Sequence, residues 1–336
     1  MLEASGTPLA EAFDLALVDL DGVAYRGPEA IPHAAESLAA ARDAGMGIVF
    51  VTNNASREAT TVAEHLVSLG IDATPDEVMT SAQAAAGLLA SELPAGAPVL
   101  VVGGRGLVTA VRETGLRIVS SADDEPVAVV QGFAPEVSWR ELAEAAYAVQ
   151  RGALHVATNL DLTLPDERGL APGNGSLVGA VVNATGVTPR SAGKPEPSMY
   201  RLAAKRRDAQ RPLVVGDRLD TDLGGAQAAG YPGLHVFTGV SDARAAVLAA
   251  PGERPTYVSA DLRGLLEPHP APTPGPDGWW TCRQRSACVE NGTLRLDGRG
   301  DVDIDLVRAA CAAAWSAADA GAPVRPEDVP VLAPTD

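Results

Sequence analysis

Aromatic residues, cysteine and positive charge are all scarce in this sequence. Phe, Trp and Tyr make up 4% of the 336 residues, whereas hydrophobic residues as a whole make up 46%. We therefore expect a core built from Val, Leu, Ile and Ala. The cysteines are odd in number and match no zinc-binding spacing, so they argue against a disulfide framework and indicate ordinary reduced thiols. They are Cys282, Cys288 and Cys311.

The charge balance and the lack of long apolar runs exclude several classes of partner. The chain has 43 acidic and 26 basic residues, a net charge of -17, which argues against the basic face that nucleic-acid binding needs. No apolar run approaches the roughly 20 residues of a membrane span, and residues 1–14 do not resemble a signal peptide. We therefore expect a cytoplasmic protein that binds neither nucleic acid nor membranes. A small anionic substrate stays compatible with this charge, because a metal ion and one lysine can reverse the sign locally.

Short apolar runs alternate with helical segments along most of the chain. The alternation predicts an α/β fold of parallel sheets with helices on both faces. Residues 267–278 are rich in proline and predict a linker, and residues 279–336 predict a small α+β unit with a hairpin around Asn291-Gly292 and a helix over 305–321. The other predicted helices are 32–45, 56–70, 82–92, 107–114, 138–151, 177–185, 197–208, 220–229 and 241–249. The predicted strands are 14–21, 47–54, 78–81, 99–104, 128–133, 154–159, 212–217, 233–239 and 255–259.

Acidic and polar residues stand where several predicted strands end, which is where open parallel sheets bind their ligands. Grouped carboxylates are ligands that Mg²⁺ prefers, and a cation would keep two neighbouring aspartates ionised. A hydroxyl, free amides and one lysine would bind the oxygens of a phosphate. The sequence therefore predicts a site for Mg²⁺ and a phosphate. Its residues are Asp19 and Asp21 after the first strand, Thr52, Asn53 and Asn54 after the second, Asp217 and Asp222 in "GDRLDTD", and Lys194 in "GKPEP".

Four motifs in this order resemble the haloacid dehalogenase superfamily. They are "DLDGV", "VTNN", "GKPEP" and "GDRLDTD", and the resemblance covers residues 12–265. The spelling is most similar to subclass IIA, whose members are phosphatases. Thr52 follows Asp19 by 33 positions, too few for a cap domain, whereas Lys194 follows Thr52 by 142 positions, which is typical of a C2 cap. The resemblance implies a Rossmann-like core over 1–93 and 188–266, a C2 cap over 94–187, and a linker with an extension over 267–336.

The resemblance also implies how the reaction proceeds. Asp19 is expected to be the nucleophile that forms an aspartyl-phosphate. Asp21 is expected to protonate the leaving alkoxide and then to activate water. Lys194 would balance the charge of Asp19 and the phosphoryl group. Asp21 favours phosphate ester chemistry over dehalogenation, because a halide leaving group needs no proton.

Further residues are implied as ligands. Thr52, Asn53 and Asn54 would bind the phosphoryl oxygens, with the hydroxyl of Thr52 and the amide of Asn53 in the main roles. Asp217 would bind Mg²⁺ together with Asp19 and the backbone carbonyl of Asp21, and Asp222 would support them. In the cap loop 158–169, Asn159 and Asp161 match recurring polar positions, and two roles stay open for them: holding the loop or contacting substrate.

The expected function is Mg²⁺-dependent hydrolysis of a small phosphate monoester. The whole chain is most similar to actinobacterial glycerol 3-phosphate phosphatases, which favours glycerol 3-phosphate as the phosphorylated metabolite. Phosphoglycolate, a nucleotide and pyridoxal phosphate stay open as substrates, and a phosphotransferase and a non-catalytic phosphometabolite-binding regulator stay open as functions. Capped relatives often pair through their caps, which favours a homodimer.

The C-terminal extension of those relatives resembles part of a GNAT acetyltransferase. Here it spans residues 268–336, about half of a complete acetyltransferase domain, and no clear acetyl-CoA pyrophosphate loop is present. We therefore expect the extension to serve in packing or at an interface rather than in acetyl transfer.

Overall fold

The computed structural model describes residues 1–166, 168–298 and 300–334, and the chain divides into two compact units. The first unit comprises residues 1–50, 68–72 and 204–336, and the second comprises residues 51–67 and 73–203. Glu167 of the expected cap loop and Arg299, Thr335 and Asp336 of the expected extension lie outside the described residues. The four-part domain division expected from the sequence stays a prediction.

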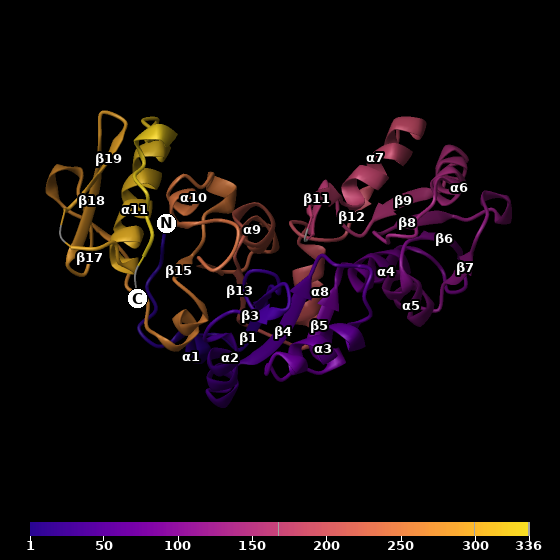
Figure 1. Ribbon diagram of the computed structural model, residues 1–336, viewed down its shortest axis with the longest axis horizontal. Helices are drawn as coiled ribbons and strands as arrows, with labels where there is room; N and C mark the ends of the chain where they lie inside the picture. Colours follow the sequence, from indigo (N-terminus) through magenta and orange to yellow (C-terminus); the bar gives the residue numbers. More distant parts are fainter. Residues whose placement is uncertain (167, 299, 335–336) are drawn as a thin grey trace. The chain divides into compact units, whose positions relative to one another are not determined.

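A parallel sheet forms the centre of the first unit (Figure 1). Strand β1 (Leu15–Val18) pairs in parallel with β13 (Pro212–Gly216) on one side and with β4 (Gly47–Thr52) on the other. All four residues of β1 are buried, as expected for a central parallel strand. The strand order is β15 (Tyr257–Ser259), β14 (Gly233–Val236), β13, β1, β4 and β5 (Val78–Thr80), of which β5 and the last two residues of β4 belong to the second unit. The helices along these segments are α1 (Leu9–Ala12), α2 (Ala34–Asp43), α9 (Gly224–Ala229) and α10 (Ala243–Val247), and a small hairpin of β2 (Tyr25–Arg26) and β3 (Glu29–Ala30) follows β1.

A second parallel sheet forms the centre of the second unit. Its strand order is β12 (Arg190–Ser191), β9 (Leu154–Ala157), β8 (Ala128–Gln131), β6 (Pro98–Val102) and β7 (Arg117–Val119). The helices are α3 (Ala59–Ser68), α4 (Ser81–Glu92), α5 (Arg105–Glu113), α6 (Trp139–Gln150), α7 (Asn174–Thr185) and α8 (Ser198–Arg206), which runs on into the first unit. Both sheets are parallel and alternate with helices, so the expected α/β fold is confirmed.

One segment of the second unit differs from the expectation. The sequence analysis predicts a cap loop over 158–169 and no strand between 159 and 177, but β10 (Thr163–Asp166) and β11 (Gly169–Pro172) pair there as an antiparallel hairpin. The helix expected over 177–185 begins earlier, at Asn174. Glycine and proline hide both elements, because neither residue contributes to an alternating or helical apolar pattern.

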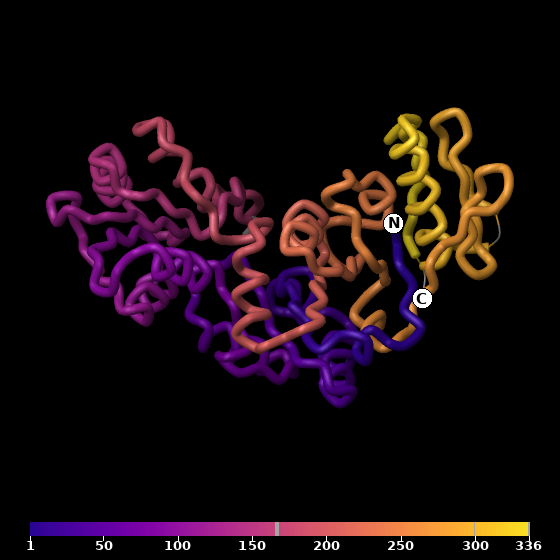
Figure 2. Tube along the Cα trace, turned by 180° about the vertical axis from the view of Figure 1, so that it is seen from behind, coloured from indigo at the N-terminus to yellow at the C-terminus, as the bar shows by residue number. Residues whose placement is uncertain are grey.

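The extension packs an antiparallel sheet against one long helix (Figure 2). Its strands are β16 (Thr273–Pro274), β17 (Trp280–Cys282), β18 (Arg285–Glu290) and β19 (Thr293–Leu296), and its helix is α11 (Ile304–Asp319). Asn291 and Gly292 join β18 to β19 with φ angles of 52° and 77°, the left-handed pair that a two-residue hairpin favours. The hairpin expected at these residues is therefore confirmed.

The segment expected as a linker is an ordered part of this unit. It contains β16 and the buried His269, whose backbone N–H and C=O pair with those of Ser5 at 3.0 and 2.8 Å. None of the helices in the described part of the chain has the length and apolarity needed to cross a membrane.

Candidate functional site

Three carboxylates of the first unit converge and form what we call the acidic cluster: Asp19, Asp217 and Asp222. Asp19 follows β1, Asp217 follows β13, and Asp222 lies on a π-helical turn over Leu219–Leu223. One oxygen from each side chain lies within 4.8 Å of the others, and the residues are 9%, 0% and 0% exposed. Buried carboxylates this close repel one another unless a cation lies among them. Because Mg²⁺ prefers oxygen ligands, these residues fit a Mg²⁺ ion.

The loop that follows β14 holds the carboxylate of Asp217 in place. The backbone N–H of Val240 donates to Oδ2 of Asp217 at 2.7 Å, and the N–H of Ser241 donates to its carbonyl at 3.1 Å. A Cβ added to Gly239 would lie 1.8 Å from the same Oδ2, so only glycine allows this approach. The position of Asp217 therefore depends on residues 239–241.

A buried histidine ties this loop to β13. Nε2 of His235 lies 3.2 Å from the carbonyl of Asp217 and 3.0 Å from that of Ser241. Burial lowers the pKa of His235 to about 4. The ring is therefore neutral at pH 7, and its Nε2–H donates to both carbonyls. His235 is a residue that the sequence analysis did not single out, because a lone histidine in a strand carries no motif.

Asp222 is held by its own turn. Its Oδ2 accepts the backbone N–H of Arg218 at 3.1 Å. A Cβ added to Gly216 would lie 2.2 Å from the Cβ of Asp222, so the glycine that ends β13 makes room for this side chain. Close packing of the end of β13 against this turn therefore explains why "GDRLDTD" begins with a glycine.

Asp21 lies outside the acidic cluster. Its side chain is exposed, and the group of carboxylates found among the described residues does not include it. Its neighbour Gly22 has a φ of 85°, in the left-handed region, and donates its N–H to the carbonyl of Tyr25 at 2.8 Å. The chain thus turns directly after Asp21, so the side chains of Asp19 and Asp21 have different environments.

Thr52 and Lys194 belong to the second unit and are both buried. Oγ1 of Thr52 accepts the backbone N–H of Asn54 at 3.1 Å, and Nζ of Lys194 lies 3.4 Å from the carbonyl of Val51. The Asn54 side chain is exposed, and its Oδ1 accepts the N–H and the hydroxyl of Ser56 at 2.9 and 2.8 Å. Asn54 therefore stabilises the turn after β4.

The side chain of Asn53 connects three segments of the second unit. Its Oδ1 accepts the backbone N–H of Lys194 at 2.8 Å, and its Nδ2 donates to the carbonyl of Lys194 at 3.1 Å and to Oδ2 of Asp161 at 3.2 Å. Nδ2 of Asn159 donates in turn to the carbonyl of Asn53 at 2.8 Å. Of the two roles left open for Asn159 and Asp161, these contacts support that of holding the loop.

Asn174 was missed by the sequence analysis, although it anchors the same loop. Its side chain is buried, and its Nδ2 donates to the carbonyl of Asn159 at 2.7 Å. Cβ atoms added to Gly173 and Gly175 would lie 2.3 Å from the carbonyl oxygen of Asp161 and 2.2 Å from that of Leu160. The "GNG" spelling, with glycines on both sides of an asparagine, was the signal that could have revealed this contact.

Family models match most of the chain. A haloacid dehalogenase-like hydrolase model matches residues 16–117, a second model for hydrolases of this type matches residues 191–265, and a GCN5-related N-acetyltransferase-like domain matches residues 282–332. The expected GNAT-like likeness of the extension is therefore confirmed.

Two relatives with similar sequences are phosphatases. The chain is 46% identical to D-glycerol 3-phosphate phosphatase of Mycobacterium tuberculosis over 95% of this chain and 90% of that protein. It is 38% identical to acid sugar phosphatase of Staphylococcus saprophyticus over 75% of this chain and 96% of that protein.

Solved structures give the same result. The glycerol phosphate phosphatase of Mycobacterium tuberculosis in complex with magnesium matches with a TM-score of 0.84 and 46% identity, covering 92% of both chains. A thermostable NPPase of Geobacillus stearothermophilus matches with a TM-score of 0.68 and 35% identity, covering 74% of this chain and 96% of that one. Together these findings show that the chain belongs to the haloacid dehalogenase-like hydrolase family, with a C2 cap, as the four motifs implied.

Proposed function

We propose that this chain is a Mg²⁺-dependent phosphatase that hydrolyses small phosphate monoesters, with glycerol 3-phosphate as the favoured substrate. The observation that carries the reaction class is the acidic cluster, in which three buried carboxylates are gathered at the ends of two strands and on the adjoining turn. The choice of substrate rests on the 46% identity to the D-glycerol 3-phosphate phosphatase of Mycobacterium tuberculosis.

In the proposed reaction, a carboxylate oxygen of Asp19 attacks the phosphorus atom and the bond from phosphorus to the ester oxygen breaks. Asp21 gives its proton to the departing alkoxide. Asp21 then takes a proton from water, the water oxygen attacks phosphorus, and the bond from phosphorus to Asp19 breaks. The products are the alcohol and inorganic phosphate. The exposed position of Asp21 supports this role, because a general acid must reach both the leaving group and water.

The remaining proposed roles concern charge. A bound Mg²⁺ would supply positive charge near the phosphate, and Asp19, Asp217 and Asp222 would hold it. Thr52 and Lys194 would bind the phosphoryl oxygens, with Lys194 also balancing the charge on Asp19. For Asn53, Asn159 and Asp161 we propose a positioning role, which their mutual hydrogen bonds support.

The experiment that tests this function measures inorganic phosphate released from a panel of esters, with Mg²⁺ and with EDTA. The panel contains both enantiomers of glycerol 3-phosphate, phosphoglycolate, UMP, AMP, pyridoxal phosphate and 4-nitrophenyl phosphate. We expect release that requires Mg²⁺, is highest with one enantiomer of glycerol 3-phosphate and is abolished by Asp19→Asn. Release from no ester, or equal release with EDTA, would refute the phosphatase, and a preference for another ester would refute the substrate.

We also propose that the protein is a cytoplasmic homodimer that pairs through the second unit. Leu162, directly before β10, is 68% exposed and Leu164 of β10 is 38% exposed. Side chains two positions apart on extended backbone share a face, and neighbouring exposed apolar side chains support an interface. Sedimentation should give a dimer, and replacing both leucines with serine should give a monomer. A monomeric wild-type protein would refute the pairing, and recovery from the membrane or culture medium after cell fractionation would refute the location.

A further inference from the structure

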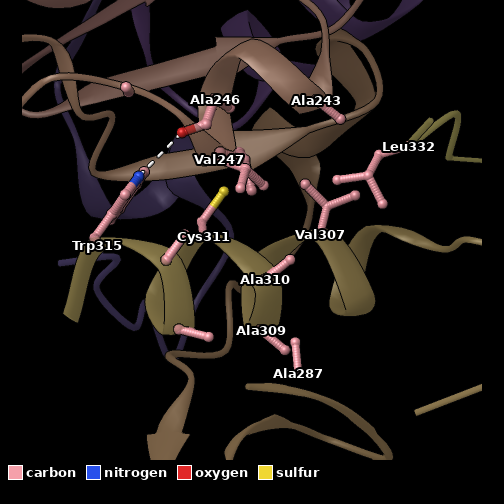
Figure 3. Packing of buried hydrophobic residues seen from close by; sticks show 14 of the residues in the cluster. Ala243, Ala246, Val247, Ala287, Val307, Ala309, Ala310, Cys311, Trp315 and Leu332 are labelled. Atoms are coloured by element: carbon pink, nitrogen blue, oxygen red, sulfur yellow. Dashed lines mark hydrogen bonds between the residues drawn. The ribbon is translucent and has the colours of Figure 1, made fainter. Parts of the chain in front are cut away.

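The extension shares one hydrophobic core with the segments that carry the acidic cluster. Helix α11 lies against α10, and buried side chains from both helices form a single group (Figure 3). Leu2 at the start of the chain and Leu332 near its end belong to the same group. From α11 the group includes Val307, Ala310, Cys311 and Trp315, and from α10 it includes Ala243, Ala246 and Val247.

Trp315 makes the most specific contact between the two helices. It is among the largest fully buried side chains, and its Nε1–H donates to the carbonyl of Ala246 at 3.0 Å. The guanidinium of Arg254 lies 5.5 Å from the centre of its ring and forms an ion pair with Asp319 at 2.8 Å. Burial, a hydrogen bond and a cation–π contact therefore all fix the tryptophan.

The tail after α11 contacts α10 as well. The guanidinium of Arg244 donates to the carbonyl of Pro326 at 2.6 Å and to that of Val329 at 3.4 Å. Helix α10 has only five residues, too few to be stable without tertiary contacts. Its position thus depends on the extension.

The beginning of α10 adjoins the loop that holds Asp217. Asp242 caps this helix by accepting the N–H of Ala245 at 2.8 Å. The two residues before the cap are Val240 and Ser241, whose N–H groups donate to Asp217 at 2.7 and 3.1 Å. A shift of α10 would therefore move the donor to the Asp217 carboxylate, Val240, and the donor to its backbone carbonyl, Ser241.

We propose that Trp315 is a positioning residue for the metal site, because it holds α10 and thereby the loop that fixes Asp217. The extension then supports the phosphatase site and needs no second activity. The inference rests on the proposed function in one respect, that Asp217 binds Mg²⁺.

Hydrogen exchange of the full-length protein tests the proposal at the loop itself. Trp315→Leu should make the amides of Val240 and Ser241 exchange about tenfold faster, as expected when contacts worth about one hydrogen bond are lost. Trp315→Phe keeps a ring but lacks the Nε1–H, so its effect should be smaller and in the same direction. Both variants should need more Mg²⁺ than the wild-type protein to reach the same thermal shift, while the amides of β1 stay protected.

Two variants control for a general loss of stability. Val181→Ala removes a buried side chain in the second unit, and Arg295→Ala breaks an exposed ion pair with Glu290 within the extension. Neither should change exchange at Val240 and Ser241.

The proposal is overturned if a folded Trp315→Leu variant leaves exchange at these amides unchanged, or if exchange rises while Mg²⁺ affinity does not fall. If Trp315→Leu does not fold, Trp315→Phe and Arg244→Ala are measured in its place. The proposal is then overturned if exchange at Val240 and Ser241 is unchanged in both variants. The two proposals fail separately, because exchange does not depend on turnover. An inactive protein with the expected exchange and Mg²⁺ affinities would refute the phosphatase alone.

Discussion

At the scale of single residues, two glycines decide whether Asp217 can occupy its position. Cβ atoms added to Gly22 and Gly239 would lie 2.5 Å and 1.8 Å from its Oδ2. Contacts this short force either the carboxylate of Asp217 or the backbone of these turns to move. The metal site is therefore shaped by residues that carry no functional group.

Gly239→Ala should lower kcat by roughly 100-fold, since a shift of about 1 Å in a reacting or metal-binding group has an effect of this size. Steady-state kinetics with the preferred ester would measure it, with circular dichroism to show that the fold is kept. Gly252→Ala is the matched control, because an added Cβ there meets nothing within 4 Å. Equal activity of the two variants would contradict the prediction.

A buried histidine should make stability depend on pH. His269 is 2% exposed, donates from Nε2 to the carbonyl of Gly264 at 2.8 Å and accepts from Arg308 at Nδ1 at 3.2 Å. Burial lowers the pKa of His269 to about 4. Between this value and the ordinary value of about 6.5, the unfolded state binds more protons than the folded state. The contribution of the neutral His269 ring to the free energy of unfolding is therefore complete above pH 6.5, and it is lost as the pH falls towards 4.

Denaturant unfolding at pH values from 7.5 to 4.5 would measure this loss. The neutral variant His269→Gln should be less stable at pH 7.5, and its stability should fall less steeply, by up to about 1.4 kcal/mol per pH unit. His235 also has a pKa near 4 but is present in both proteins, so only the difference in slope counts. Parallel curves would contradict the prediction.

At the scale of elements, the sequence predicted the helices and strands that are marked by local features such as caps and apolar runs. Ser138 and Glu141 form a capping box at the start of α6, and the helix runs over Trp139–Gln150 within the expected range of 138–151. The residues of the acidic cluster were found in the same way, because each closely follows a buried apolar strand. Long-range pairs carry no local signal. Asn53 and Asp161 are 108 positions apart, and nothing in either segment indicates their hydrogen bond.

The contact between α7 and the loop before β10 gives a prediction at this scale. Asn174→Ala removes the buried hydrogen bond to the carbonyl of Asn159, which should lower the free energy of unfolding by about 1 to 3 kcal/mol because a buried carbonyl loses its donor. Asn183→Ala, an exposed position on the same helix, should change it by less than about 0.5 kcal/mol. Similar losses in both variants, measured by urea unfolding, would argue against the anchoring role.

At the scale of the whole molecule, the acidic cluster couples metal binding to stability. Three carboxylates buried together raise the free energy of the metal-free protein. Protein stripped with EDTA should therefore gain Tm as Mg²⁺ is added, by an amount that rises with concentration and corresponds to about 2.7 kcal/mol at 100 times the Kd. Asp222→Asn should lose most of this gain, as differential scanning fluorimetry would show. An equal gain in both proteins would place the binding ion elsewhere.

The shared core of the first unit also sets the order in which a growing chain can fold. Residues 73–203, which supply nearly all of the second unit, are synthesised before β13. β1 must meanwhile wait for β13, nearly two hundred positions later, and Leu2 must wait for Trp315 and Leu332. At bacterial or eukaryotic synthesis rates this delay is on the order of 10 to 60 s. A chain that ends within the extension already contains β13 and can cover β1, but it lacks part of the core that buries Leu2 and α10. Such a chain leaves apolar side chains uncovered and is a substrate for chaperones and proteases.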